Sequence, residues 1–186
     1  MKLIFFDLET TGLNYEKNGI HQISGCVEIN GEEKEFFNFN VAPNPRLEIS
    51  EEALLVSNKT KEEVMAYPAM AIVFKQFTDL LSKYVDKYNK TDKFFLVGYN
   101  NNSFDNQFLR SWFLQNGDKF FGSWFWTNTL DVFVLASQKL LKKRAEMPDF
   151  KLNTVCQFMG IEVDGSKLHD ASYDIELTRE LYKRSI

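Results

Sequence analysis

The chain has 186 residues, 44% of them hydrophobic, and a formal net charge of −4. This length predicts one domain over residues 1–186 with a sizeable core, and the acidic balance argues against a general electrostatic grip on nucleic acid. It leaves room for a small site where metal ions offset local negative charge. No membrane-length apolar stretch and no signal peptide are evident, so we expect a cytoplasmic protein that contacts no membrane. Cys26 and Cys156 are expected to be free thiols.

Strand patterns occupy the first part of the chain. They cover residues 2–8, 20–29 and 34–41. The dipeptide Asn30-Gly31 separates the second pattern from the third, and it is a strong signal for a two-residue hairpin turn. Three consecutive antiparallel strands are therefore expected.

Helix patterns dominate the rest of the chain. The expected helices cover residues 50–56, 60–66, 69–87, 104–116, 129–141, 152–159 and 170–184. One short apolar strand, residues 94–98, interrupts them. Ser50 can cap the first helix, and Thr60 with Glu63 forms a capping box for the second. Strands followed by alternating helices and strands indicate a mixed sheet flanked by helices.

Two acidic residues directly follow the first apolar run. Asp7 and Glu9 stand two apart in the string DLETTG, after KLIFF. Residues two apart on a strand point to the same face, so both carboxylates continue the face begun by Leu3 and Phe5. Like charges side by side at the edge of a core are costly unless something neutralises them. A divalent cation is the simplest candidate.

Two further carboxylates lie on apolar helix stripes. Asp105 and Asp174 each have apolar residues three and seven positions away along the same predicted helix. Charged groups are rarely buried unpaired, and neither stripe carries a basic residue. The alternative is that both acids occupy helix N-termini, where they favour the dipole and cap free N–H groups. Their occurrence together with Asp7 and Glu9 favours one shared site.

The two histidines receive different interpretations. His169 precedes Asp174 by five positions in HDASYD, in the loop that enters the last helix. Without the carboxylates it would count as a surface residue, but beside them it is a candidate proton acceptor, since its pKa lies near neutrality. His21 lies in a predicted strand with no partner at an informative spacing, and it is assigned no role.

The three acidic strings together resemble the motifs of the DEDD superfamily of 3′–5′ exonucleases, in its histidine-containing, DnaQ-like branch (DEDDh). DLETTG resembles the first motif, GYNNNSFD the second and HDASYD the third. The tyrosine-containing branch places Tyr four residues before the last Asp, where this chain has Asp170. The layout is similar to that of proofreading epsilon subunits and RNase T. This resemblance implies a ribonuclease H-like α/β fold, with a mixed sheet of about five strands, the first three antiparallel, flanked by helices.

The resemblance also implies a reaction, namely two-metal-ion hydrolysis at the 3′ end of single-stranded DNA or RNA that releases nucleoside 5′-monophosphates. Two Mg²⁺ or Mn²⁺ ions would be held by Asp7, Glu9, Asp105 and Asp174. His169 would be the general base.

A second group of residues is implied to hold the terminal nucleotide. It consists of Thr10, Thr11, Leu13, Asn101 and Phe104. Phe104 resembles a family aromatic residue that packs beside the terminal base, and plain core packing is the alternative.

Two other segments have open interpretations. The aromatic residues within 120–126 can form a stacking platform, but core packing or a partner contact is favoured about three to one. The basic residues within 139–144 form the one dense basic run, and they fit either a phosphate contact or a solvated helix end.

The subfamily and the partners stay open. Proofreading subunits typically have His where this chain has Asn100 and Ser57, and WFWTNTLD lacks the Tyr-Arg signature of oligoribonucleases. A stand-alone exonuclease is the leading interpretation, and a proofreading module bound to a DNA polymerase subunit is the second. A binding or scaffolding domain without catalysis is a third, which the presence of all four acids and His169 argues against. The oligomeric state is not fixed by the sequence.

Overall fold

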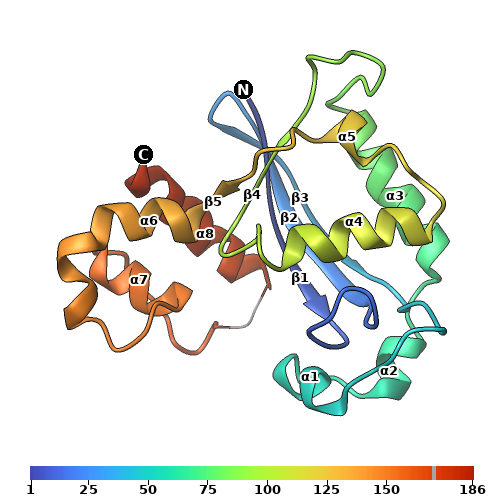
Figure 1. Ribbon diagram of the computed structural model, residues 1–186, viewed down its shortest axis with the longest axis horizontal. Coiled ribbons are helices and arrows are strands. Elements are labelled where there is room, and N and C mark those ends of the chain that lie inside the picture. The colour runs from blue at the N-terminus through green and yellow to red at the C-terminus, as the bar shows by residue number, and fades with distance from the viewer. Residues whose placement is uncertain (169–170) are drawn as a thin grey trace.

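A five-stranded mixed sheet lies between two groups of helices in the computed structural model, which describes residues 1–168 and 171–186 (Figure 1). The strand order is β3-β2-β1-β4-β5. The central strand β1 (Lys2–Thr10) pairs antiparallel with β2 (Ile20–Ile29) and parallel with β4 (Phe95–Gly98). The edges are β3 (Glu32–Asn40) and β5 (Leu130–Asp131). The expected mixed sheet with three antiparallel strands first is confirmed.

The hairpin between β2 and β3 forms where the sequence predicts it. Asn30 and Gly31 have φ values of 54° and 85°, which the tight turn requires and which Asn and Gly tolerate best. The register then places Ile29 opposite Glu32. The turn chemistry therefore fixes the pairing of these two strands.

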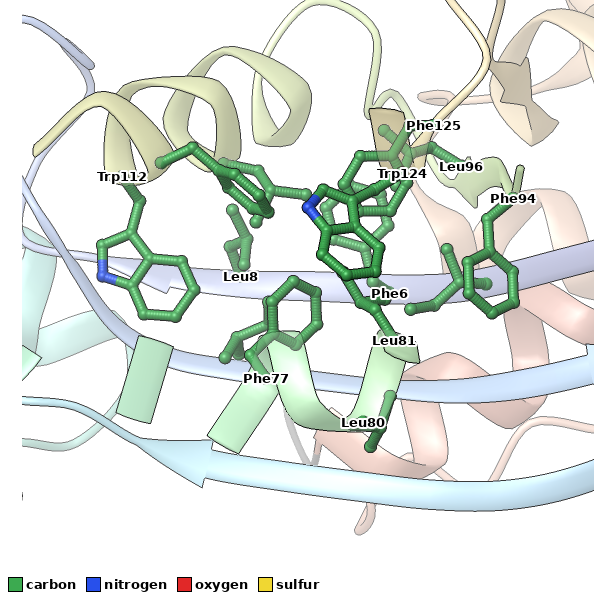
Figure 2. Packing of buried hydrophobic residues seen from close by; sticks show 14 of the residues in the cluster. Phe6, Leu8, Phe77, Leu80, Leu81, Phe94, Leu96, Trp112, Trp124 and Phe125 are labelled. Carbon is green, nitrogen blue, oxygen red and sulfur yellow. The ribbon is translucent and has the colours of Figure 1, made fainter. Parts of the chain in front are cut away.

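One face of the sheet carries α3 (Met70–Ser82), α4 (Asp105–Gln115) and α5 (Phe121–Trp124). The even-numbered residues of β1 supply Ile4, Phe6 and Leu8 to this core, and Figure 2 shows Phe6 and Leu8 packed among rings from these helices. Alternate side chains of a strand point to opposite faces, so the odd-numbered residues belong to the other side.

The opposite face carries α6 (Val132–Leu140), α7 (Leu152–Phe158) and α8 (Ala171–Ser185), seen together on one side of Figure 1. Leu3 and Phe5 of β1 are buried there, at 1% and 0% exposure. The next residues on this face are Asp7 and Glu9, as the alternation predicts.

Two short helices, α1 (Glu51–Val56) and α2 (Lys61–Met65), lie near the carboxyl end of β1 (Figure 1). The Ser50 hydroxyl accepts a hydrogen bond from the Ala53 amide at 3.3 Å, which confirms the predicted cap. Both bonds of the Thr60–Glu63 capping box are present. The Ser50 amide donates to the Thr11 carbonyl at 2.8 Å, so α1 is attached directly to the end of β1.

Three segments differ from the sequence expectation. The helix expected over 69–87 ends at Ser82, although Val85 stays buried in the turn that follows and so extends the apolar pattern. The helix expected over 129–141 begins as strand β5 and continues into the 3₁₀ helix η1 (Leu141–Glu146). The third segment is α5, a helix of four residues that the sequence did not predict. Strand β5 is too short to show a period of two, and α5 is too short to show a helical period.

No helix in the described part of the chain is long and apolar enough to cross a membrane.

Candidate active site

The acidic residues meet at the carboxyl end of β1, where the sheet is open on one side. The pairing of β1 with β4 ends at Phe5 and Val97, whereas β1 continues to Thr10. The Leu8 amide lies in the stretch of β1 that β4 does not reach, and it donates to Asp105 Oδ1 at 3.2 Å. The first residue of α4 therefore takes the place of the missing strand neighbour and holds a carboxylate beside Asp7.

Asp7 lies at the centre of the negative charge. Burial and the charges of Asp105, Glu9 and Asp174 raise its pKa well above the ordinary value of 3.8. Each of these effects disfavours ionisation of Asp7. The structure thus brings Asp7 together with the other three predicted carboxylates, those of Glu9, Asp105 and Asp174.

Asp105 is buried, with 6% of its surface exposed, and its pKa rises to about 7. Burial is the largest cause, and the charges of Glu9 and Asp131 add to it. Hydrogen bonds from the backbone amides of Asp105 and Leu8 act in the opposite direction. Asp105 does occupy a helix N-terminus, as the alternative interpretation states. It also accepts a hydrogen bond from outside its helix, from the Leu8 amide of strand β1.

Asp174 also lies in the first turn of its helix, α8. It lines a cavity of about 500 Å³ together with Tyr99, Phe150 and Lys151. The predicted base His169 lies outside the described residues.

The donor chemistry fits a hard divalent cation. Glu9 on β1, Asp105 on α4 and Asp174 on α8 each repel the charge of Asp7, and carboxylate oxygens are the ligands that such cations prefer. Within residues 1–168 and 171–186, however, no three acidic, histidine or cysteine side chains are already close enough together to hold a metal ion. The acids form a shared negative field here rather than a closed ligand shell.

The residues predicted to hold the terminal nucleotide differ in exposure. The Thr10 hydroxyl donates to the Gly12 carbonyl at 2.8 Å, and the fully buried Thr11 hydroxyl donates to the Glu48 carbonyl at 3.0 Å. These hydroxyls shape the loop after β1, and the Thr11 amide and carbonyl are also bonded internally, to the Gly19 carbonyl and the Ser50 amide. Leu13 is 86% exposed, as an apolar contact for a substrate would require.

The second-motif residues divide in the same way. Asn101 is fully buried, and its amide donates to Thr129 Oγ1 at 2.9 Å, which does not fit a direct contact with substrate. Phe104 is partly exposed, and its ring lies 4.9 Å from that of Phe108. Its two interpretations are therefore compatible, because one side of the ring packs while part of it faces solvent.

Asp131 is a site residue that the sequence interpretation missed. Its Oδ1 accepts bonds from the Asn100 and Phe133 amides at 2.9 and 3.0 Å, and its Oδ2 accepts one from the Asn102 amide at 3.2 Å. It therefore caps α6 and fixes the loop that leads to Asp105. An Asp directly before an apolar helix was the available signal.

Several secondary predictions also have an outcome. Phe121, Trp124 and Phe125 are core residues, as favoured, whereas Phe120 is 72% exposed. His21, to which the sequence assigns no role, has its Nε2 3.3 Å from Ser57 Oγ, a partner far away in sequence.

The dense basic run is solvated. Lys142 and Lys143 are exposed on η1, and the Arg144 guanidinium lies over the Phe150 ring at 5.3 Å. Cys26 and Cys156 are free and buried, as expected.

Comparisons with known proteins agree with this arrangement. The chain's fold is shared with E. coli Exonuclease I bound to a dT13 oligonucleotide (22% identity, TM-score 0.76), over 98% of this chain and 40% of that one. A zinc-bound complex of E. coli Exonuclease I with single-stranded DNA gives 22% identity and a TM-score of 0.76, over 98% and 39% of the two chains. The chain thus spans about two fifths of the length of these proteins. No curated protein matches it.

A family model described as Exonuclease, of the RNase T group, matches residues 4–182. With the strand order β3-β2-β1-β4-β5 and the acids at the end of β1, this match shows that the chain belongs to the RNase T exonuclease family and has its ribonuclease H-like fold.

Proposed function

We propose that the chain is a metal-dependent 3′–5′ exonuclease of the DEDDh type, which removes nucleoside 5′-monophosphates from single-stranded DNA or RNA. The observation that carries the proposal is the convergence of Glu9, Asp105 and Asp174 on Asp7, whose pKa their charges raise. Solved complexes of E. coli Exonuclease I with dT13 and dA16 support a single-stranded substrate.

The carboxylates of Asp7, Glu9, Asp105 and Asp174 would hold two Mg²⁺ or Mn²⁺ ions. When bound, such ions activate water and stabilise the charge that develops on the phosphate. The Leu8 amide keeps the Asp105 carboxylate turned toward β1 through its 3.2 Å hydrogen bond. This contact presets one metal ligand before any ion arrives.

His169 would accept the proton of the attacking water, which its ordinary pKa near neutrality allows. Leu13 and Phe104 would flank the terminal nucleotide, one from the loop after β1 and one from the residue before α4. Asp131 acts as a positioning residue, since it holds the loop between β4 and α4 and contributes no atom to the reaction.

The direct test uses a 5′-labelled single strand with Mg²⁺. The protein should produce a ladder that descends one nucleotide at a time, and EDTA should stop it. Asp7→Ala should reduce turnover by about three orders of magnitude or more, whereas Asp79→Ala, an exposed acid paired with Lys75 on α3, should leave it unchanged. An uncut strand, or Mg²⁺-dependent turnover that survives in Asp7→Ala, would sink the proposal.

His169→Ala separates the proton acceptor from the metal ligands. We expect turnover to fall by about 10²–10⁴-fold while Mg²⁺ binding, followed by calorimetry, stays close to that of the parent. A parallel loss of metal binding would instead place His169 among the ligands. Rates on matched DNA and RNA oligomers will assign the preferred sugar.

A further inference from the structure

A second cavity, of about 480 Å³, adjoins the proposed active site and is used by none of its reaction steps. Its walls include Asn102, Asn106 and Arg110 on the α4 side, and Trp126 and Thr127 on the stretch between α5 and β5. Asn106 and Arg110 lie four positions apart on α4, so they share one face of that helix. The cavity therefore lies between this helix face and the segment that leads into the edge strand.

Hydrogen bonds fix both walls. The Ser111 hydroxyl donates to the Tyr15 carbonyl at 3.0 Å, which joins α4 to the loop after β1. The Thr129 hydroxyl donates to the Leu96 carbonyl at 2.7 Å and accepts from the Asn101 amide at 2.9 Å. The cavity is thus a preformed feature of the fold rather than a gap beside a loose loop.

The cavity lies near the proposed nucleotide site along two chain segments. Tyr15 lines the cavity and follows Leu13 by two residues, a separation of at most about 7 Å. Asn102 also lines it and precedes Phe104 by two residues. Both residues that flank the terminal nucleotide are therefore near neighbours of the cavity wall.

The chemistry of the walls matches a nucleotide. The Arg110 guanidinium lies 4.5 Å from the centroid of the Phe121 ring, and it forms no ion pair within the described part of the chain. Trp126 is partly exposed, whereas the other two tryptophans, Trp112 and Trp124, are each only 2% exposed. Asn102 offers an exposed amide beside them. An aromatic surface, an unpaired cation and an amide suit a base and its phosphate.

The cavity also lies at a suitable distance from the reacting end. Arg110 follows Asp105 by five positions, which is about 7.5 Å along the axis of α4. A strand whose last nucleotide lies beside Asp105 has further nucleotides only on its 5′ side. We propose that the cavity holds a base on the 5′ side of the terminal nucleotide, with Trp126 against the base and Arg110 against an adjacent phosphate. This inference rests on the proposed function, because that function supplies the strand and its direction.

The test compares a single nucleotide with a longer strand. Binding of dTMP and (dT)₆ is measured by calorimetry in EDTA on an Asp7→Asn background, so that no hydrolysis occurs. The hexamer should bind more tightly than dTMP, and Arg110→Gln with Trp126→Leu should reduce hexamer affinity about tenfold while leaving the affinity for dTMP unchanged. The matched control is Lys90→Gln with Tyr88→Leu, which removes an exposed cation and an aromatic residue that is 84% exposed.

Arg110→Gln alone guards against a folding defect, because Arg110 is exposed on α4. It should reduce the magnitude of the slope of log K against log salt concentration for hexamer binding by about 0.7, which is the value for one phosphate contact on a single strand. An unchanged slope, or equal losses for dTMP and hexamer, would overturn the inference. Failure of the exonuclease proposal would show differently, as an absence of cleavage by the unsubstituted protein with Mg²⁺, whatever the binding data show.

Discussion

Helix α8 lies beside two groups of acidic residues that have different charged neighbours. In its first turn, Asp174 is one of three acids whose charges raise the pKa of Asp7. Five residues later, Arg179 reaches Glu28 on β2 at 3.2 Å and Glu33 on β3 at 2.5 Å. The buried acid Glu28 is thus paired with an arginine of helix α8, whereas the charges that raise the pKa of Asp7 come from three other acids. This difference fits a site at the end of β1 that takes a cation from solution.

The largest stability effect should come from the pairing of Arg179 with Glu28 and Glu33. Arg179→Met leaves Glu28 buried without its partner, since the two side chains are 12% and 5% exposed. We expect a loss of about 3–5 kcal/mol in the free energy of unfolding, measured by urea denaturation. Lys75→Met, which breaks an exposed pair on α3, should cost about 0.5 kcal/mol or less. Equal losses in the two variants would remove the distinction between a buried and a surface pair.

The acids around Asp7 should respond to substitution with the opposite sign. Asp7→Asn removes a carboxylate whose ionisation is disfavoured by burial and by three neighbouring acids. The metal-free variant should therefore melt a few degrees above the parent, at about 2–4 °C for each kcal/mol gained. Added Mg²⁺ should raise the melting temperature of the parent and leave that of the variant nearly unchanged. A variant that melts below the parent in EDTA would contradict this account.

The pH dependence of the metal-free protein sharpens the same comparison. Asp105 has a folded-state pKa of about 7, against an ordinary value of 3.8. Between these values the folded state binds more protons than the unfolded state, so this residue's contribution to stability falls as pH rises. Asp105→Asn keeps an acceptor for the Leu8 amide but cannot titrate. We expect its stability relative to the parent to increase from pH 5 to pH 8 in urea titrations, and a constant difference would refute the raised pKa.

The sequence predicts the acidic site well because its signals are local. The alternation along β1 placed Asp7 and Glu9 on one face, and Asn30-Gly31 set the hairpin. The order of the three motifs then indicated the fold. Each of these features depends on residues only a few positions apart, so tertiary packing had little opportunity to override them.

Features that depend on distant partners could not be predicted in the same way. The bond from Leu8 to Asp105 spans 97 positions, and that from Asn100 to Asp131 spans 31. Asn101 resembled a substrate contact, yet its amide is used internally by Thr129. The burial of a polar side chain is decided by which segments pack beside it, and the residue type alone does not reveal this.

His21 provides the smallest and most local test, with the sign of the charge reversed. It is a buried base, and burial followed by the charge of Lys59 lowers its pKa from 6.5 to about 4. Between these values the unfolded state binds more protons, so its contribution to stability is lost as pH falls from 6.5 toward 4. Lys59→Gln should raise the pKa of His21 by a few tenths of a unit, because a nearby partly screened charge is removed. The chain has two histidines, so NMR titration of their ring protons can follow His21 directly. Lys61→Gln is the control, and an equal shift in both variants would show that net charge, rather than the proximity of Lys59, sets this pKa. If either variant restored the ordinary pKa of His21, surface charge rather than burial would be the main cause of the shift.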